Sequence, residues 1–96
     1  MFTIKRLSQF DEWFDELRDG VTKRRLVVRL RKAQLGNLGD VKPVGEGVSE
    51  MRIDYGPGYR VYFTHRGHRL VILLAGGDKS TQAKDIQSAK ELARNL

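Results

Sequence analysis

The sequence contains no cysteine, which excludes a disulfide framework and any thiolate chemistry. Long hydrophobic runs are also missing, because the longest one, Leu70 to Ala75, is far too short to cross a membrane. The first residues, Met-Phe-Thr-Ile-Lys-Arg, lack the apolar core of a signal peptide. We therefore expect a soluble protein of the cytoplasm that does not contact a membrane.

Acidic residues are scarce relative to basic ones. The 96 residues include 18 lysines and arginines against 12 aspartates and glutamates, a net charge of +6. An excess of this size favours an anionic partner, and nucleic acid, an acidic protein or a membrane surface all fit it. The length suits one domain with one modest core, which we place at residues 1–96.

Hydrophobic periodicity predicts an α+β fold. The expected order is strand, helix, helix, three or four antiparallel strands and a final helix, with the helices packed on a small sheet. Ser8 is expected to cap the first helix, Gly20 to end it, and Ser80 or Thr81 to cap the last one. The expected strands are 2–7, a short one at 41–44, two within 50–64, and 69–75. The expected helices follow Ser8, span 21–35 and follow Thr81, the last with a buried stripe of Ala83, Ile86, Ala89, Ala93 and Leu96.

Residues 50–64 read as a hairpin that turns at Gly56-Pro57-Gly58. Successive strand residues point to opposite faces, so apolar side chains gather on one face and polar ones on the other. If the strands are antiparallel neighbours, the polar face carries Glu50, Arg52, Arg60 and Tyr62 side by side. This face is equally well explained as an ordinary solvated surface with cross-strand ion pairs.

The helix expected at 21–35 is basic on every side except its apolar stripe of Leu26, Leu30 and Ala33. A run of like charges repels itself unless an anion screens it, so we predict an acidic partner here. A solvated helix face is the plainer alternative. The basic residues of this region are Arg18, Lys23, Arg24, Arg25, Arg29, Arg31 and Lys32.

The segment after the last expected strand begins Gly76-Gly77 and places Lys79 just before a helix. An ammonium group beside free helical N–H groups is a plausible phosphate site, whereas a glycine turn with a capping residue is the structural alternative. The histidines at 65 and 68 have no further His or Cys partners, and they read as turn residues. We predict neither a metal nor another cofactor.

Five segments together resemble the RelE/ParE toxin superfamily, in the branch called HigB-like or phage-derived addiction-module killer proteins. The resemblance covers nearly the whole chain and implies a toxin neutralised by a cognate antitoxin, often a helix-turn-helix protein through which DNA would be contacted. The segments are Lys-Arg-Arg-Leu-Val-Val-Arg-Leu at 23–30, Gly-Asn-Leu-Gly-Asp-Val-Lys-Pro-Val-Gly at 36–45, Ser-Glu-Met-Arg-Ile at 49–53, Gly-Tyr-Arg-Val-Tyr-Phe at 58–63 and Leu-Leu-Ala-Gly-Gly-Asp-Lys-Ser-Thr-Gln at 73–82.

The resemblance also implies site residues. Arg60 matches the strand arginine with which RNA-cleaving members hold the scissile phosphate. Glu50 and Arg52 lie where relatives carry catalytic lysines or acids, and Lys79 lies near a second basic position. The tyrosine or histidine that relatives have near the last helix is missing here. The candidate RNA-binding residues are Lys23, Arg24, Arg25, Arg29, Lys42 and Tyr62.

Metal-free RNA cleavage needs the ribose 2′-hydroxyl deprotonated, the phosphorane charge stabilised and the leaving oxygen neutralised. Glu50 is the candidate base, Arg60 and Arg52 would stabilise the phosphorane, and Lys79 would act as an acid or a second clamp. With so weak a set of proton-transfer groups, we expect the ribosome to position the mRNA. Two alternatives remain open: a ParE-like gyrase inhibitor that binds without cleaving, and a regulatory partner whose activity has decayed.

Overall fold

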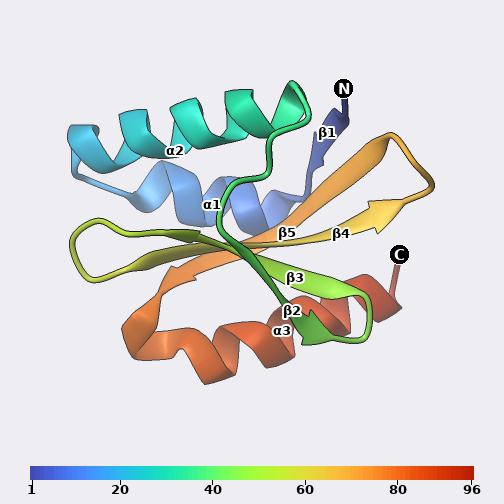
Figure 1. The fold of residues 1–96 in the computed structure, drawn as a ribbon. Coiled ribbons are helices and arrows are strands. Elements are labelled where there is room, and N and C mark those ends of the chain that lie inside the picture. Colours follow the sequence, from blue (N-terminus) through green and yellow to red (C-terminus); the bar gives the residue numbers. More distant parts are fainter.

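The computed structural model describes residues 1–96 as one twisted sheet with helices on both faces (Figure 1). This arrangement confirms the predicted α+β class. The elements are β1 (Thr3–Arg6), α1 (Ser8–Glu16), α2 (Gly20–Gln34), β2 (Val41–Gly45), β3 (Val48–Ile53), β4 (Tyr59–Arg66), β5 (Leu70–Asp78), the 3-10 helix η1 (Lys79–Thr81) and α3 (Gln82–Arg94).

The sheet has five strands in the order β1-β5-β4-β3-β2. β1 runs parallel to β5, whereas every other pair is antiparallel. The sequence pattern predicts three or four antiparallel strands after the helices and leaves the pairing of the first strand open. The observed sheet is therefore mixed, because the chain crosses over through α1 and α2 before it returns to form the antiparallel strands. No helix is long and apolar enough to cross a membrane.

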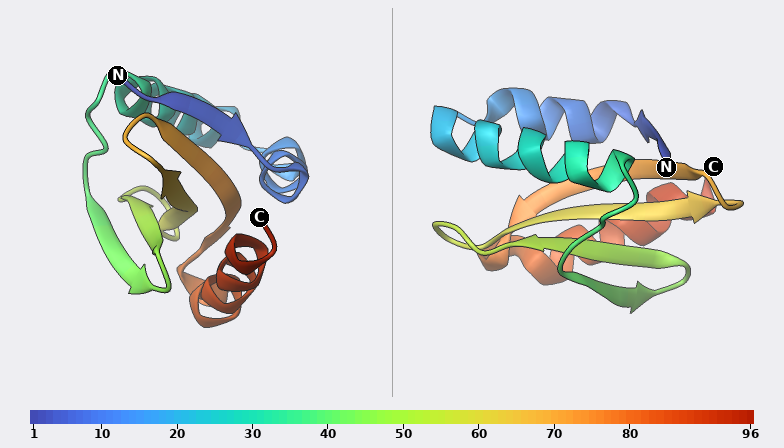
Figure 2. Two further views of the ribbon diagram at one scale, coloured as in Figure 1. Left: turned by 90° about the vertical axis from the view of Figure 1, so that its right-hand side faces the viewer. Right: turned by 45° about the horizontal axis from the view of Figure 1, so that its top comes forward.

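Each face of the sheet has its own hydrophobic core. Phe10 of α1 and Leu26 and Ala33 of α2 pack against one face, as the predicted stripe on α2 requires. Ala89 of α3 packs with Tyr62 against the other face. Both views in Figure 2 keep α3 on the opposite side of the sheet from α2.

The second core overturns one reading of the hairpin. Because α3 covers the part of the polar face that holds Glu50 and Tyr62, this part is not solvated: Glu50 is 1% exposed and Tyr62 is fully buried, whereas the Arg52 side chain is 40% exposed. The strands are antiparallel neighbours and the four side chains lie side by side as predicted, with Glu50 opposite Tyr62 and Arg52 opposite Arg60. A single sequence could not distinguish the two outcomes, because either face of an amphipathic strand can be covered by a helix.

Several predicted helix ends were wrong. Ser8 is the first residue of α1 and Leu7 is its cap, without a side-chain hydrogen bond. Gly20 begins α2 instead of ending α1, and the carboxylate of Asp19 caps α2 by accepting a hydrogen bond from the Val21 N–H at 3.0 Å. Hydrogen bonds from Thr22 and Val21 hold the pKa of Asp19 below its usual value. The local backbone geometry decides which residue caps a helix, and sequence patterns leave this choice open.

The glycines at 76 and 77 also differ from the prediction of a turn. They lie in β5, which continues to Asp78. A Cβ atom on Gly76 would meet the ring of Trp13, and one on Gly77 would meet the carboxylate of Asp85. In α3, Ile86, Ala89 and Ala93 pack on the sheet as predicted, but Ala83 and Leu96 are exposed. These two residues lie in the first turn and beyond the end of α3, where the helix no longer faces the sheet.

Candidate functional site

Three basic side chains from separate elements converge on one cavity beside the β3–β4 turn. Arg52 comes from β3, Arg60 from β4 and Lys79 from η1, and the cavity has a volume of about 370 Å³. The strand pairing explains the convergence, because Arg60 lies opposite both Arg52 on β3 and Gly77 on β5, two residues before Lys79. The remaining lining residues are Asp40, Ile53, Asp54, Gly56, Pro57 and Gly58. We call this the hairpin cavity.

Arg60 is held at the inner wall of the hairpin cavity. Its Nη1 donates a hydrogen bond to the Gly58 carbonyl at 2.8 Å, and its side chain is only 13% exposed. Gly58 has a φ of 82°, and a Cβ atom there would lie 3.0 Å from Arg60 Nη1. Glycine at this turn therefore permits both the backbone conformation and the position of the guanidinium.

Glu50 lies behind Arg60 and is nearly inaccessible. Its Oε2 is 3.7 Å from Arg60 Nε, and its side chain is 2% exposed. The Nε2 group of Gln82 in α3 donates hydrogen bonds to Oε1 at 3.2 Å and Oε2 at 3.0 Å. This placement argues against the expected role as general base, because a substrate hydroxyl does not reach either oxygen in this conformation. Gln82 was not predicted as a site residue, because no periodicity or motif in the sequence marks it.

The side chain of Arg52 is more exposed than that of Arg60 and forms an ion pair with Asp40. Its Nη2 donates a hydrogen bond to Asp40 Oδ1 at 2.9 Å, and 40% of its side chain is exposed. The hydrogen bond from Arg52 lowers the pKa of Asp40, and the same contact raises the pKa of Arg52. Both groups therefore stay charged, and Arg52 can turn toward an anion in the cavity at the cost of an exposed ion pair.

Lys79 is exposed and lines the hairpin cavity, as its predicted role requires. The helical N–H groups expected beside it are less available, because the Asp78 carboxylate accepts a hydrogen bond from the Ser80 N–H at 2.8 Å. Hydrogen bonds from Ser80 lower the pKa of Asp78, which keeps this cap ionised. Thr81 precedes α3 without capping it, and its hydroxyl donates to Asp85 instead. Lys79 thus contributes its ammonium group to the hairpin cavity without the predicted N–H cradle.

Tyr62 and Lys42, both predicted to bind RNA, lie away from the cavity. Tyr62 is fully buried between the sheet and α3, so its ring offers no face on which a base could stack. Burial, followed by the negative charge of Glu50, raises the pKa of its phenol. Lys42 is exposed on the edge strand β2, opposite Glu50 in the register.

Tyr62→Phe should leave the fold intact. The Tyr62 hydroxyl is buried with no protein group in hydrogen-bond distance, so its removal deletes no internal hydrogen bond. We expect the free energy of unfolding, measured in urea, to change by less than about 1 kcal/mol.

Ultraviolet titration should identify the same residue. The raised pKa means that the folded state opposes ionisation of Tyr62, so the phenol stabilises the fold below pH 10 and this contribution falls as the pH rises further. The titration of the wild type should contain a late phenol signal that is missing from the titration of Tyr62→Phe. Titration curves of the same shape for the two proteins, apart from amplitude, would show that Tyr62 is accessible.

The basic residues of α2 do not act as one group. Lys23 turns toward α1, where its Nζ lies 3.4 Å from the Asp15 carbonyl. Arg29 is structural: it donates hydrogen bonds to the carbonyls of Arg52 at 2.6 Å and Leu38 at 3.1 Å, and its burial lowers its pKa. The guanidinium of Arg29 is therefore bound to backbone carbonyls, whereas Lys23 lies on the side of α2 that faces α1.

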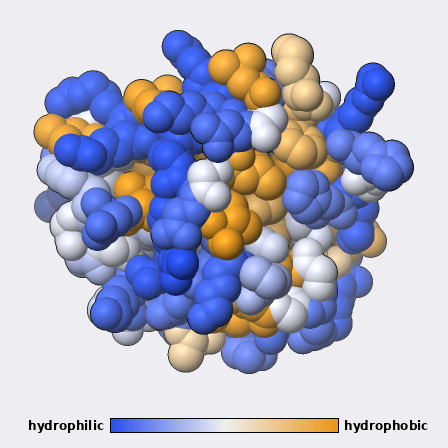
Figure 3. Space-filling view, in the orientation of Figure 1, coloured by the Kyte–Doolittle hydropathy of each residue, from blue (hydrophilic) through white to orange (hydrophobic).

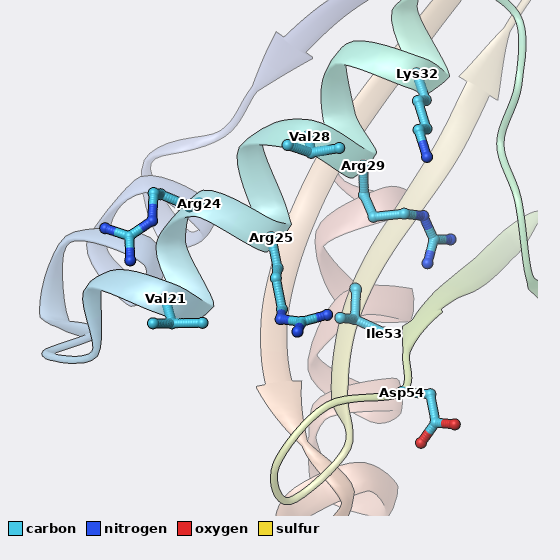
Figure 4. Close-up of a pocket in the computed structure, with 8 residues that line it drawn as sticks. All are labelled: Val21, Arg24, Arg25, Val28, Arg29, Lys32, Ile53 and Asp54. Atoms are coloured by element: carbon cyan, nitrogen blue, oxygen red, sulfur yellow. The ribbon is translucent and has the colours of Figure 1, made fainter.

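Arg24 and Arg25 instead line a second cavity, of about 440 Å³, between α2 and the end of β3 (Figure 4). Arg25 reaches across this cavity, and its guanidinium lies 4.2 Å from the centre of the Tyr55 ring. The floor is apolar, formed by Val21, Val28 and Ile53. We call this the α2 cavity.

The sequence of the chain matches a described protein family. The family described as "Phage derived protein Gp49-like" matches residues 12–96. The chain belongs to the Gp49-like family. A Haemophilus influenzae protein, named only "Uncharacterized protein", is 50% identical to this Gp49-like chain over 93 residues, which cover 97% of the chain and 94% of the relative. The match begins within α1 and includes both cavities, so the site described above lies inside the family region.

Proposed function

We propose that this Gp49-like protein is the toxin of a toxin–antitoxin pair and cleaves mRNA on the ribosome. The observation that carries the proposal is the convergence of Arg52, Arg60 and Lys79 on one open cavity. Planar guanidinium groups match the oxygen atoms of a phosphodiester, and a cluster of cations stabilises the additional charge of a phosphorane. Two further supports are the RelE/ParE resemblance and the association of the Gp49-like family with RelE-like toxin–antitoxin proteins.

The proposed reaction is an attack of the ribose 2′-oxygen on the neighbouring phosphorus, which breaks the bond to the 5′-oxygen. The 2′-hydroxyl would give its proton to a water molecule and the leaving 5′-oxygen would take one from the Lys79 ammonium, so the products are a cyclic phosphate and a 5′-hydroxyl. Arg60 would hold the scissile phosphate, Arg52 would stabilise the developing charge, and Lys79 would neutralise the leaving oxygen. Alignment of the message by the ribosome would supply much of the remaining acceleration.

Glu50 enters this proposal as a positioning residue instead of the general base. Its carboxylate is fixed by Gln82 and faces Arg60 Nε, so it orients the guanidinium. Glu50→Gln should lower the cleavage rate by about 10- to 100-fold through a misplaced Arg60. The shape of the pH–rate profile should stay the same, because no titrating base has been removed.

Gln82→Ala is the companion variant for this prediction. It removes the group that holds Glu50 without changing a charge, so it should produce a smaller loss of rate and the same profile. Single-turnover rates measured between pH 5 and pH 9 provide the comparison. Loss of the acidic limb of the profile in Glu50→Gln alone would instead make Glu50 the general base.

The decisive test of the function is to map mRNA ends in a purified translation reaction. Cuts at fixed codon positions that require ribosomes would support the proposal, and intact message would contradict it. A parallel supercoiling reaction with DNA gyrase tests the ParE-like alternative, in which the protein binds and inhibits gyrase without cutting RNA. The proposal also assigns the protein to the cytoplasm, where it would meet the ribosome and a cognate antitoxin, itself the DNA-binding partner.

A further inference from the structure

The outer surface of α2 exposes apolar side chains in a regular line. Val21, Val28 and Leu35 are 37%, 51% and 66% exposed, and Val27 beside them is 45% exposed. The first three are seven residues apart, so successive members lie on the same side of the helix about 10 Å apart. Aliphatic groups left open along one helix mark an interaction surface better than scattered ones do.

Two cavities follow this line. The α2 cavity has Val21 and Val28 on its floor, and a smaller cavity of about 220 Å³ lies between Val27, Val28 and Leu35. They are adjacent, because Val28 and Lys32 line both. Figure 3 shows the result as orange patches between blue side chains over the region where Figure 1 places α2.

Cations border the apolar line on both sides. Four of these cations are free of backbone contacts: Arg24 and Arg25 border the first cavity, Arg31 borders the second, and Lys32 borders both. Arg29 also lines the first cavity, but it is bound to backbone carbonyls. Among the residues lining the two cavities, Asp54 is the only acidic one. The surface therefore combines two adjacent cavities lined by apolar side chains with a border of positively charged side chains.

We propose that this surface binds an acidic amphipathic helix of a partner protein. Such a helix would place apolar side chains seven residues apart into the two cavities and its carboxylates against the four cations. The inference names the partner class and the docking surface of the proposed toxin, and its biological meaning rests on that proposed function. The binding itself does not depend on RNA cleavage.

Two other occupants fit the surface less well. RNA would use the cations, but aliphatic valine and leucine side chains offer bases no planar surface, and the ring of Tyr55 is already engaged by Arg25. A second copy of this chain in a two-fold dimer would bring the same four cations against themselves. Of these occupants, only an acidic amphipathic helix would both cover the exposed apolar side chains and neutralise the cations beside them.

The experiment is an NMR titration of the ¹⁵N-labelled wild-type protein with designed peptides. The first peptide is an acidic helix with leucines seven residues apart and glutamates at its flanks. The second has the same composition with the leucines distributed around the helix, and the third carries lysine in place of glutamate. A single-stranded RNA 12-mer is the fourth probe. We expect only the first peptide to bind tightly and to shift amide signals throughout residues 21–35.

Val28→Asp should weaken binding of the first peptide at least tenfold in a fluorescence anisotropy assay. Val28 is half-exposed, so this variant should keep the wild-type circular dichroism spectrum. Gln87→Asp, at an exposed position of α3, adds the same charge away from the surface and should bind like the wild type. Both variants should retain ribosome-dependent cleavage.

Several results would overturn the inference. Equal binding of the two acidic peptides would show that charge alone is recognised, and RNA that displaces the peptide from α2 would make this a nucleic-acid surface. Concentration-dependent shifts without any probe would indicate a second copy, and no binding of any probe would remove the site. Wild-type protein that binds the acidic peptide but leaves mRNA intact would instead contradict the proposed function alone.

Discussion

Arg60→Ala should reduce ribosome-dependent mRNA cleavage by about two to three orders of magnitude, the usual effect of removing one group that stabilises a transition-state charge. Arg60 is the residue on which the hairpin cavity depends most, because its guanidinium is held by Gly58 and faces Glu50 at the inner wall. The loss should be measured as single-turnover cleavage on programmed ribosomes, together with growth inhibition after induced expression.

Arg69→Ala is the matched control for this prediction. It removes the same charge from an exposed position in the β4–β5 turn, far from the cavity in the strand register, and should cleave like the wild type. Arg60→Lys keeps the charge but loses the planar fork, so its rate should lie between those of the wild type and Arg60→Ala. A folded Arg60→Ala protein with full activity would eliminate the proposed phosphate site.

Gly76→Ala should be strongly destabilising, because the added methyl group would meet a rigid aromatic ring. A Cβ atom at this position would lie 2.1 Å from Cε3 of Trp13, with two more ring atoms at 2.4 Å. The indole is a rigid group packed between α1 and β5, so α1 must move to relieve the clash. Overpacking of this kind should lower the free energy of unfolding by about 2 to 3 kcal/mol, measured by urea denaturation.

Gly20→Ala provides the comparison at a glycine that needs no special space. Its Cβ atom would make an ordinary contact of 3.4 Å with Arg24, and the residue already lies in the first turn of α2. Its free energy of unfolding should therefore change by less than about 1 kcal/mol. Wild-type stability of Gly76→Ala would mean that Trp13 does not pack on β5 as the structure has it.

The fold could be predicted from the sequence to the extent that its local patterns were unambiguous. Alternation in 50–64 and the turn at 56–58 correctly predicted the hairpin and the residues that share each of its faces, because successive strand residues point to opposite faces. The stripe of Leu26, Leu30 and Ala33 correctly predicted the buried side of α2. Local capping was less predictable, as Ser8 and Gly20 show, because several nearby residues could fill the same role.

The candidate site was predicted in part. The sequence marked Arg52, Arg60 and Lys79 separately, and strand pairing brings them to one cavity. It did not reveal that α3 buries Glu50 and Tyr62, that Gln82 holds the carboxylate, or that Arg29 is used by backbone carbonyls. Each of these three features depends on a contact between residues at least 20 positions apart in the sequence. Local periodicity carries no information about such contacts.

The amino-acid sequence by itself determined the strongly basic charge, the absence of thiol chemistry, the hairpin that carries Arg52 and Arg60, and the amphipathic helices. These properties follow from composition and from side-chain spacing along the chain. Only the tertiary structure decided which polar groups face a partner and which are buried. That decision depends on where α3 and α2 cross the sheet, since a helix packed over a strand turns an exposed carboxylate or phenol into an interior one.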